Sequence, residues 1–229
     1  MPAMIVTGAA RGIGLELVRR AVADGRRVIA THRPGPPSQA LDDLAAAHPA
    51  KLRLMALDVG DPADVEGFGA RVGEPVDALV NNAGVLLERN ADTLAQTMTW
   101  AAFETSFRIN AIAPLFVARS VLPLMTAPAR ILTISSFMGS LSYAKSDTTA
   151  YRASKAAVNK AMQALATDLA PRGIAVAVIH PGWVRTDMGG AGADLSVEES
   201  AAGVLAVLDR LDLSGTGRFY RVDGTEAPW

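Results

Sequence analysis

Tyr151 and Lys155 are two side chains with complementary acid–base chemistry, and they stand four positions apart. They lie in an Ala-rich segment, residues 149–169, that is expected to be helical. Residues i and i+4 of a helix share a face, so the phenol and the ammonium are expected side by side. A nearby ammonium favours the phenolate and lowers a tyrosine pKa by about one to three units. Such a tyrosine donates and accepts protons near neutral pH, although the same spacing also occurs on surfaces without function.

The elements that must position this pair follow from the pattern of the whole chain. Short β-branched runs alternate with longer Ala-rich segments, which is typical of βαβ units and a parallel sheet. We predict strands over residues 3–7, 27–31, 52–57, 76–80, 130–135, 174–180 and 217–220. We predict helices over residues 13–24, 38–48, 62–72, 100–125, 149–169 and 197–210, and a Gly-rich mobile loop over 182–196. Without a linker or repeat, residues 1–229 are expected to form one domain.

Composition excludes several classes of function. The chain has 229 residues and a formal net charge of −1, so no basic surface is expected to bind nucleic acid. It contains no cysteine, which excludes disulfides, thiolate chemistry and Cys-based metal sites. The N-terminus has no secretory signal pattern, and no apolar stretch reaches the roughly 18 residues that a membrane span needs. A soluble, cytoplasmic protein without membrane or metal is therefore expected.

A glycine-rich segment, Thr7-Gly-Ala-Ala-Arg-Gly-Ile-Gly14, joins the first predicted strand to the first predicted helix. Gly8, Gly12 and Gly14 would permit a tight turn, close approach of the backbone to a pyrophosphate, and close helix packing. The helix N-terminus adds free N–H groups and a partial positive charge for an anion. Glycines also make ordinary turns, and the spacing differs from the standard Gly-x-Gly-x2-Gly. The position between strand and helix nevertheless favours a dinucleotide site.

Four segments together resemble the short-chain dehydrogenase/reductase family. They are the glycine loop at 7–14, Asn-Asn-Ala-Gly at 81–84, Tyr-x3-Lys at 151–155 and Pro-Gly at 181–182, in the family's order and across nearly the whole chain. Met138-Gly-Ser, the segment from His180 to Gly190 and the ending Asp223-Gly-Thr-x-x-Pro-Trp229 resemble the C-factor-like carbonyl reductases of that family. The resemblance implies a single-domain α/β Rossmann fold with a doubly wound, mostly parallel seven-stranded sheet and helices on both faces. It also implies NAD(H) or NADP(H) as the hydride carrier.

The choice between these cofactors is argued from charge. NAD-preferring sites place an acid after the second strand to bind the ribose 2′-OH, but this chain has Thr31-His32-Arg33 there. Arg33, and Arg11 from the glycine loop, offer guanidinium groups that match a 2′-phosphate. NADP(H) is favoured and NAD(H) remains possible, because both arginines also suit a solvated surface. The role of His32 stays open.

The resemblance implies further cofactor contacts along the carboxyl edge of the sheet. Asp58 would accept from the adenine amine, or it begins the turn toward the next helix. Asn82 is either mainly structural or near the adenosine half, and the Thr186 hydroxyl would bind the nicotinamide carboxamide. The predicted cofactor-binding residues are Gly8, Arg11, Gly12, Ile13, Gly14, Arg33, Asp58, Val59, Asn81, Ala83, Gly84, Tyr151, Lys155, Pro181, Gly182, Val184 and Thr186.

The remaining candidate catalytic residues are Ser136 and Asn110. A hydroxyl at the carboxyl end of a strand can donate to a substrate carbonyl and stabilise its developing negative charge. Ser135 competes for this role, and the resemblance assigns it to Ser136. Asn is a poor helix-interior residue because its amide competes for backbone hydrogen bonds, so a kink is expected at Asn110. The resemblance implies that Asn110 links Lys155 through water to solvent.

These residues predict NADPH-dependent reduction of a small ketone or aldehyde to an alcohol, reversible in principle. Hydride leaves the nicotinamide, Tyr151 protonates the oxygen, Ser136 polarises it, and Lys155 lowers the tyrosine pKa and binds the ribose. The alternative is a catalytically silent NADP-binding regulatory or signalling protein of the C-factor type. Trp183 is either an apolar wall for the substrate or a core residue. A homodimer or homotetramer is expected, because the family commonly pairs the helices that carry Asn110 and Tyr151.

Overall fold

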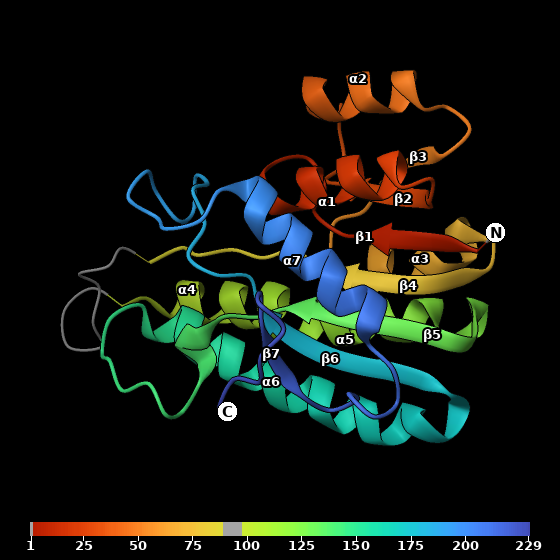
Figure 1. Ribbon diagram of the computed structural model, residues 1–229. Helices are drawn as coiled ribbons and strands as arrows, with labels where there is room; N and C mark the ends of the chain where they lie inside the picture. The colour runs from red at the N-terminus through yellow and green to blue at the C-terminus, as the bar shows by residue number, and fades with distance from the viewer. Residues whose placement is uncertain (1, 89–97) are drawn as a thin grey trace.

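Seven parallel strands form one sheet in the order β3-β2-β1-β4-β5-β6-β7 (Figure 1). The structure is a computed structural model that describes residues 2–88 and 98–229. The strands are β1 Ala3–Val6, β2 Arg27–His32, β3 Leu52–Ala56, β4 Val76–Asn81, β5 Met125–Ile134, β6 Ile174–His180 and β7 Phe219–Arg221. The chain order reverses between β1 and β4, so the crevice for a ligand is expected at the carboxyl ends of these two strands.

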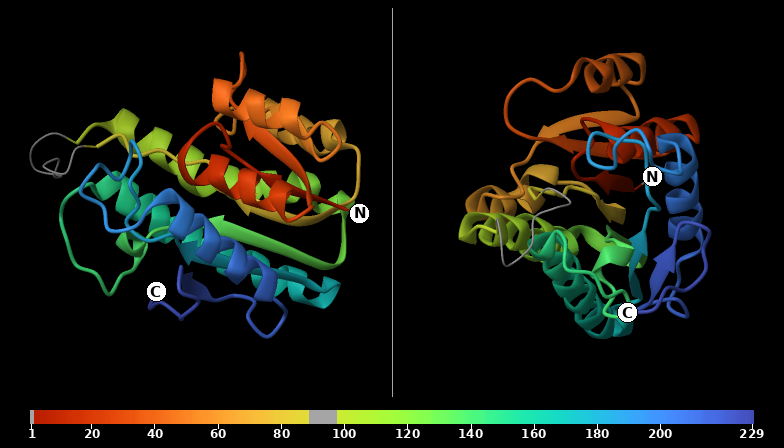
Figure 2. Two further views of the ribbon diagram at one scale, coloured as in Figure 1. Left: turned by 45° about the horizontal axis from the view of Figure 1, so that its top comes forward. Right: turned by 90° about the vertical axis from the view of Figure 1, so that its left-hand side faces the viewer.

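Helices cover both faces of this sheet, which the two views of Figure 2 separate. They are α1 Gly12–Ala23, α2 Gln39–Ala47, α3 Pro62–Val72, α4 Trp100–Phe107, α5 Ala113–Val121, α6 Thr149–Leu169 and α7 Val197–Arg210. On one face α1 packs against α7, and on the other α3 packs against α5 and α4 against α6. The predicted doubly wound Rossmann architecture is confirmed, and the sheet is wholly parallel.

Each face of the sheet has its own hydrophobic core. Successive strand side chains point to opposite faces, so Ala3 and Ile5 of β1 pack toward α3, α5 and α6, whereas Met4 and Val6 pack toward α1 and α7. All four residues are at most 2% exposed. A strand that is buried on both sides reads as a continuous apolar run, which explains why the strands were recognisable from sequence.

The single long helix predicted over residues 100–125 is divided in the structure. After α4 the backbone makes a wider π-helical turn at Arg108–Ile112, continues as α5, and ends in a 3₁₀ turn at Leu122–Leu124. Pro114 cannot donate to the carbonyl of Asn110, and this missing bond coincides with the wider turn. β5 then begins at Met125, five residues earlier than predicted. The kink expected at Asn110 is therefore present.

The run Trp100–Leu124 is long and apolar enough to cross a membrane by length and composition, and an 18-residue window within it has a mean hydropathy of 1.3. The sequence-based expectation that no stretch qualifies was wrong on this criterion. A helix of this composition is also what a packed core requires, and here α5 lies against α3 and α4 against α6.

Candidate active site

The glycine loop lies against the end of β4, at the point where the strand order reverses. Gly8 has φ of +67°, and a side chain there would place its Cβ 2.8 Å from the Cα of Ala83. A Cβ on Gly14 would lie 2.4 Å from the Gly8 carbonyl oxygen. These two approaches exclude any larger residue, so the predicted turn and close packing are present. α1 begins at Gly12, directly behind the loop, and its N-terminus faces the crevice.

The two asparagines at the end of β4 have structural partners. Asn82 Nδ2 donates to the carbonyl oxygens of Thr7 and Gly8 at 2.9 and 3.0 Å, which is the structural role left open from sequence. Asn81 is 3% exposed, and its Nδ2 donates to Pro114 O and Thr133 Oγ1, both at 3.2 Å. The Asn81 side chain therefore ties β4 to α5 and β5, and a cofactor contact from this residue stays a prediction for its backbone.

The segments that carry the two candidate phosphate-binding arginines meet at the end of β2. Ala9 N donates to Thr31 O at 2.8 Å, and Ser38 Oγ donates to Ala10 O at 2.5 Å. Ser38 stands at the N-cap of α2 as predicted, but its side chain makes no cap hydrogen bond. Arg33 is exposed beside this junction.

Arg11 and Arg33 have neighbours in the structure that were not predicted from the sequence. Arg11 forms an ion pair with Asp187, in which both side chains are largely exposed. The sequence analysis did not anticipate this partner. His32 is 8% exposed and its Nδ1 contacts the Arg33 carbonyl at 2.8 Å, so it holds the backbone and does not face the crevice.

Asp58 lies at the end of β3, where its carboxylate organises the turn into α3. Its Oδ1 accepts from Gly60 N at 2.8 Å, and its own N–H donates to Asp64 Oδ2 at 2.7 Å. The turn role left open from sequence is present. Val59 packs on the core of the α3 face, so an adenine contact from this residue would come from its exposed portion or its backbone.

Residues 182–196, predicted to be a mobile loop, make several contacts with one another. Val184 and Leu195 make a β-bridge, and Arg185 Nη1 donates to the carbonyls of Ala193 and Asp194, both at 2.9 Å. A Cβ on Gly189 would lie 2.0 Å from the Val184 carbonyl oxygen. This glycine is therefore required by close packing and not by flexibility.

The same loop extends over the glycine loop and carries an exposed tryptophan. A Cβ on Gly12 would lie 3.4 Å from Thr186 Cγ2, so the two predicted cofactor loops approach each other directly. Trp183 is 53% exposed, and its Nε1 donates to the Gly189 carbonyl at 2.8 Å. Of the two roles considered for Trp183, the core role is excluded.

Tyr151 and Lys155 share one face of α6, as their spacing predicts. They are 8% and 4% exposed, and Lys155 Nζ lies 5.7 Å from the centre of the Tyr151 ring. Ser136 lies close enough to the Tyr151 phenol to lower the pKa of that phenol, and its Oγ accepts from Met138 N at 3.1 Å. Ser135 instead donates to Asn159 Oδ1 at 2.5 Å inside the protein. The structure therefore brings Ser136, and not Ser135, to the tyrosine.

The acid–base properties of the pair are set by burial. Burial raises the pKa of Tyr151 to about 12, and the hydrogen bond with Ser136 opposes the rise. Burial also lowers the pKa of Lys155 to about 8. The net shift of the Tyr151 pKa is upward and not downward as expected, because the loss of water around the phenol outweighs the influences that favour the phenolate. At neutral pH the pair is a neutral phenol beside an ammonium.

Asn110 lies in the π-helical turn and faces the loop after β4. Its Nδ2 donates to Val85 O at 2.8 Å and to Ser154 Oγ at 3.1 Å, and its Oδ1 accepts from Val85 N at 2.8 Å. A Cβ on Gly84 would lie 3.2 Å from Asn110 Oδ1 and 3.7 Å from Lys155 Nζ. Both polar atoms thus lie on the side of Gly84 that a side chain would occupy, and the expected link between them through water would pass there.

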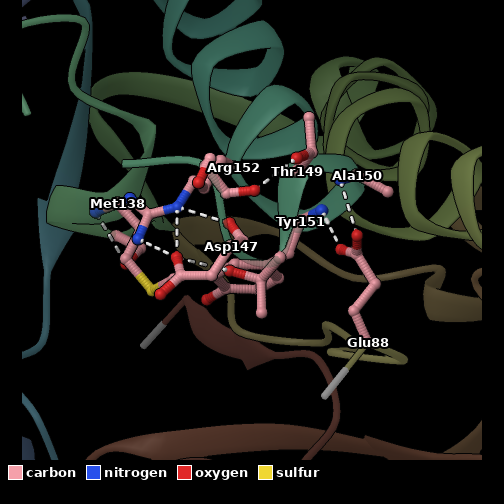
Figure 3. Close-up of polar contacts among 10 residues, drawn as sticks. Glu88, Met138, Asp147, Thr149, Ala150, Tyr151 and Arg152 are labelled. Carbon is pink, nitrogen blue, oxygen red and sulfur yellow. Dashed lines mark hydrogen bonds and ion pairs between the residues drawn. The ribbon is translucent and has the colours of Figure 1, made fainter. Parts of the chain in front are cut away.

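A buried carboxylate that the sequence analysis missed contacts the helix of the tyrosine. Glu88 is 7% exposed, and its Oε1 and Oε2 accept from Ala150 N at 3.0 Å and from Tyr151 N at 2.7 Å (Figure 3). Thr148 occupies the N-cap of α6 but makes no side-chain cap hydrogen bond. Because threonine is an ordinary N-cap residue, nothing local in the sequence indicates that the cap comes from 60 residues away.

Comparisons with known proteins agree with this geometry. The family model described as short chain dehydrogenase matches residues 2–194. The C-signal of Myxococcus xanthus is 43% identical over 159 residues, which are 68% of this chain and 93% of that protein. The 3-oxoacyl-(acyl-carrier-protein) reductase FabG of Escherichia coli is 33% identical over 217 residues, 92% of this chain and 83% of that one. An NADPH-bound carbonyl reductase from chicken fatty liver superposes with a TM-score of 0.91 at 34% identity, covering 100% and 99% of the two chains.

Proposed function

The chain belongs to the short-chain dehydrogenase family, and from this premise we propose that it is an NADPH-dependent reductase that converts a ketone or aldehyde into an alcohol. The observation that carries the proposal is the buried phenol of Tyr151, which lies beside the Lys155 ammonium and close enough to Ser136 for that hydroxyl to lower its pKa. These groups lie at the carboxyl edge of the sheet, next to the glycine loop.

The glycine loop and residues 183–186, which approach each other at Gly12 and Thr186, are the elements proposed to bind a dinucleotide. The loop leaves no room for side chains at Gly8 and Gly14, and the N-terminus of α1 behind it favours a pyrophosphate. Arg33, exposed beyond β2, and Arg11 favour a cofactor with a 2′-phosphate. When bound, the nicotinamide supplies the hydride. The Thr186 hydroxyl and the backbone near Val184 are the groups available to orient its carboxamide.

In the reduction, a residue of this chain must protonate the substrate carbonyl oxygen, which gains negative charge. Tyr151 is a neutral phenol at physiological pH, which is the state that can donate a proton. Ser136, within hydrogen-bonding reach of the phenol, would share the same substrate oxygen and stabilise its charge. Lys155 is largely protonated at pH 7 and stabilises the phenolate that remains. The Asn110 amide is hydrogen-bonded to the backbone of Val85, and its oxygen lies on the same side of Gly84 as Lys155 Nζ.

The second candidate is an NADP-binding signalling protein that performs no chemistry. It is favoured by the 43% identity to a protein named C-signal. A protein that only senses NADP has no need of a phenol, a serine and an ammonium buried together. The two candidates differ in turnover and not in cofactor binding.

The first experiment is a fluorescence titration with NADPH and with NADH, followed by their oxidation in the presence of ketones, aldehydes and quinones. We expect consumption with NADPH preferred. Tyr151→Phe should keep the wild-type Kd for NADPH and lose on the order of 10²–10⁴-fold in kcat. Tyr220→Phe, on β7 and bonded to Gly215 O at 3.3 Å, is the matched control with unchanged kcat. Tight binding without consumption would favour the signalling protein, and wild-type rates in Tyr151→Phe would exclude the tyrosine mechanism.

A further inference from the structure

Glu88 is a buried carboxylate that has no place in the tetrad of Asn110, Ser136, Tyr151 and Lys155. It follows β4 by seven residues and is 7% exposed. Removing a carboxylate from water is costly unless hydrogen bonds replace the lost hydration. Here each carboxylate oxygen accepts a backbone N–H, from Ala150 and from Tyr151 (Figure 3). Both of the hydrogen bonds described for Glu88 therefore end on the first turn of α6.

The first turn of α6 depends on this carboxylate because it lacks a cap of its own. Thr148, at the N-cap, has φ of 47° and makes no side-chain cap hydrogen bond. The first turn contains no acidic residue. A helix N-terminus leaves N–H groups without partners and carries a partial positive charge, and Glu88 supplies both the acceptors and the opposite charge.

We propose that Glu88 is a positioning residue that sets the place of the Tyr151 phenol through the backbone of Tyr151. The 2.7 Å bond ends on the N–H of the tyrosine itself, so a shift of this bond displaces the residue that carries the phenol. The proposal rests on the proposed function, in which that phenol donates the proton. A misplacement of about 1 Å in a catalytic group costs on the order of 100-fold in rate.

The segment that bears Glu88 also holds the other end of the proton path. Val85, three residues earlier, is bonded through both its N–H and its carbonyl to the amide of Asn110, at 2.8 Å each. Residues 85–88 therefore join the π-helical turn of Asn110 to the helix of Tyr151.

The ion pair between Arg152 and Asp147, at the same turn of α6, has a different role. Arg152 donates from Nε to the carbonyl oxygen and to Oδ1 of Asp147, at 2.7 and 3.0 Å. These bonds fasten residues 140–148 to α6 and do not involve the backbone of Tyr151. Among the residues that the structure describes, Glu88 is thus the charged side chain with a hydrogen bond to the Tyr151 backbone.

The test uses Glu88→Gln and Glu88→Ala in the full chain. Gln keeps the size and one acceptor oxygen, but its NH₂ group opposes the second N–H, so one of the two bonds is lost. Asp61→Ala is the control, because it also removes a carboxylate that caps a helix, accepting from Ala63 N at 3.0 Å at the start of α3. The readouts are Tm, the Kd for NADPH, kcat at a temperature well below Tm, and the ¹³Cζ resonance of Tyr151, assigned with Tyr151→Phe.

We expect Glu88→Gln to lower kcat by about 10- to 100-fold while the Kd for NADPH stays within about twofold. Its Tyr151 ¹³Cζ resonance should move toward the position of solvent-exposed tyrosines. Asp61→Ala should lower Tm without changing kcat or that resonance. Glu88→Gln with wild-type kcat and an unmoved resonance would overturn the proposal and leave the reductase standing. A wild type that reduces no carbonyl, with a resonance that still moves in Glu88→Gln, would overturn the reductase and support the positioning of Tyr151 by Glu88.

Discussion

The ammonium of Lys155 donates a hydrogen bond to the carbonyl oxygen of Ile134 at 2.9 Å, inside the protein at the end of β5. The bond ties α6 to the strand that ends just before Ser136, so it joins the two elements that carry the candidate catalytic phenol and hydroxyl. It satisfies one of the three donors of the ammonium. Burial nevertheless lowers the pKa of Lys155 from 10.5 to about 8. The buried ammonium therefore destabilises the folded protein at neutral pH.

Replacement of this lysine should therefore make the protein more stable and inactive. The pKa shift corresponds to about 3 kcal/mol of destabilisation at neutral pH, which the variant would avoid. Loss of the hydrogen bond to Ile134 would destabilise the variant by about 1 kcal/mol. We expect Lys155→Met to raise the free energy of unfolding at pH 7 by about 1–2 kcal/mol, measured by urea denaturation. Lys160→Met, an exposed site on the same helix, is the control that should change little.

The stability advantage of Lys155→Met should depend on pH. Below pH 8 the folded protein must hold a buried charge, and the penalty is complete. Between about pH 8 and 10.5 the unfolded chain binds more protons at Lys155 than the folded one, so wild-type stability contributed by this group rises with pH. The advantage of Lys155→Met should shrink across this window. An advantage that is constant from pH 7 to 10 would show that burial of the charge is not its cause.

The rates of reduction and oxidation should depend on pH in opposite directions. With the pKa of Tyr151 raised to about 12, the phenol remains protonated and able to donate across the neutral range. Reduction should hold its kcat up to about pH 8 and decline as Lys155 loses its proton. Alcohol oxidation needs the phenolate, so its kcat should increase steadily from pH 7 to 10. Profiles of kcat in both directions on one carbonyl–alcohol pair test this, and parallel profiles would contradict it.

The empty side of Gly84 should be required for the proton path. A methyl group there would lie 3.2 Å from Asn110 Oδ1 and 3.7 Å from Lys155 Nζ, distances that allow folding but fill the space for a connecting water. We expect Gly84→Ala to fold normally and to lose at least about tenfold in reduction kcat. Gly67→Ala, whose methyl would meet the Arg71 guanidinium at 3.2 Å, is the control. An unchanged kcat in Gly84→Ala would mean that no water is needed between the two side chains.

The fold and the catalytic pair were predictable because their signals are local. Strands buried on both faces, as β1 is, read as continuous apolar runs, and Tyr151 and Lys155 meet because four residues make about one helical turn. The family resemblance, including its C-factor-like carbonyl reductases, is confirmed by the comparisons.

The contacts that escaped prediction join residues far apart in the chain. Glu88 caps α6 from another loop, and Arg11 pairs with Asp187 across 176 positions. Asn81 and Asn82 are both asparagines of the same motif. The Asn81 side chain nevertheless lies inside the protein, because successive strand residues face opposite sides of the sheet. The pKa of Tyr151 was misjudged for a related reason: the charge beside it is visible in sequence, whereas the burial that dominates is a property of the packed molecule.

The ion pair between Arg11 and Asp187 yields the last prediction, which concerns cofactor affinity. Both side chains are more than 70% exposed, so the pair contributes at most about 1 kcal/mol. Its carboxylate competes with a 2′-phosphate for the same guanidinium. Asp187→Asn should therefore tighten NADPH by about two- to fivefold and leave NADH unchanged, while Arg11→Ala should weaken NADPH selectively.

The control for this prediction is Asp209→Asn, which breaks the exposed ion pair with Arg26 at 2.7 Å and changes the net charge equally. The readout is the Kd for NADPH and NADH by fluorescence at two salt concentrations. If Arg11 binds the phosphate, the difference between Asp187→Asn and wild type should decrease at high salt, because screening weakens both the ion pair and the phosphate contact. Equal NADPH affinities in the two Asn variants would show that Arg11 is not released toward the cofactor, and Arg33 alone would then remain as the candidate for the 2′-phosphate.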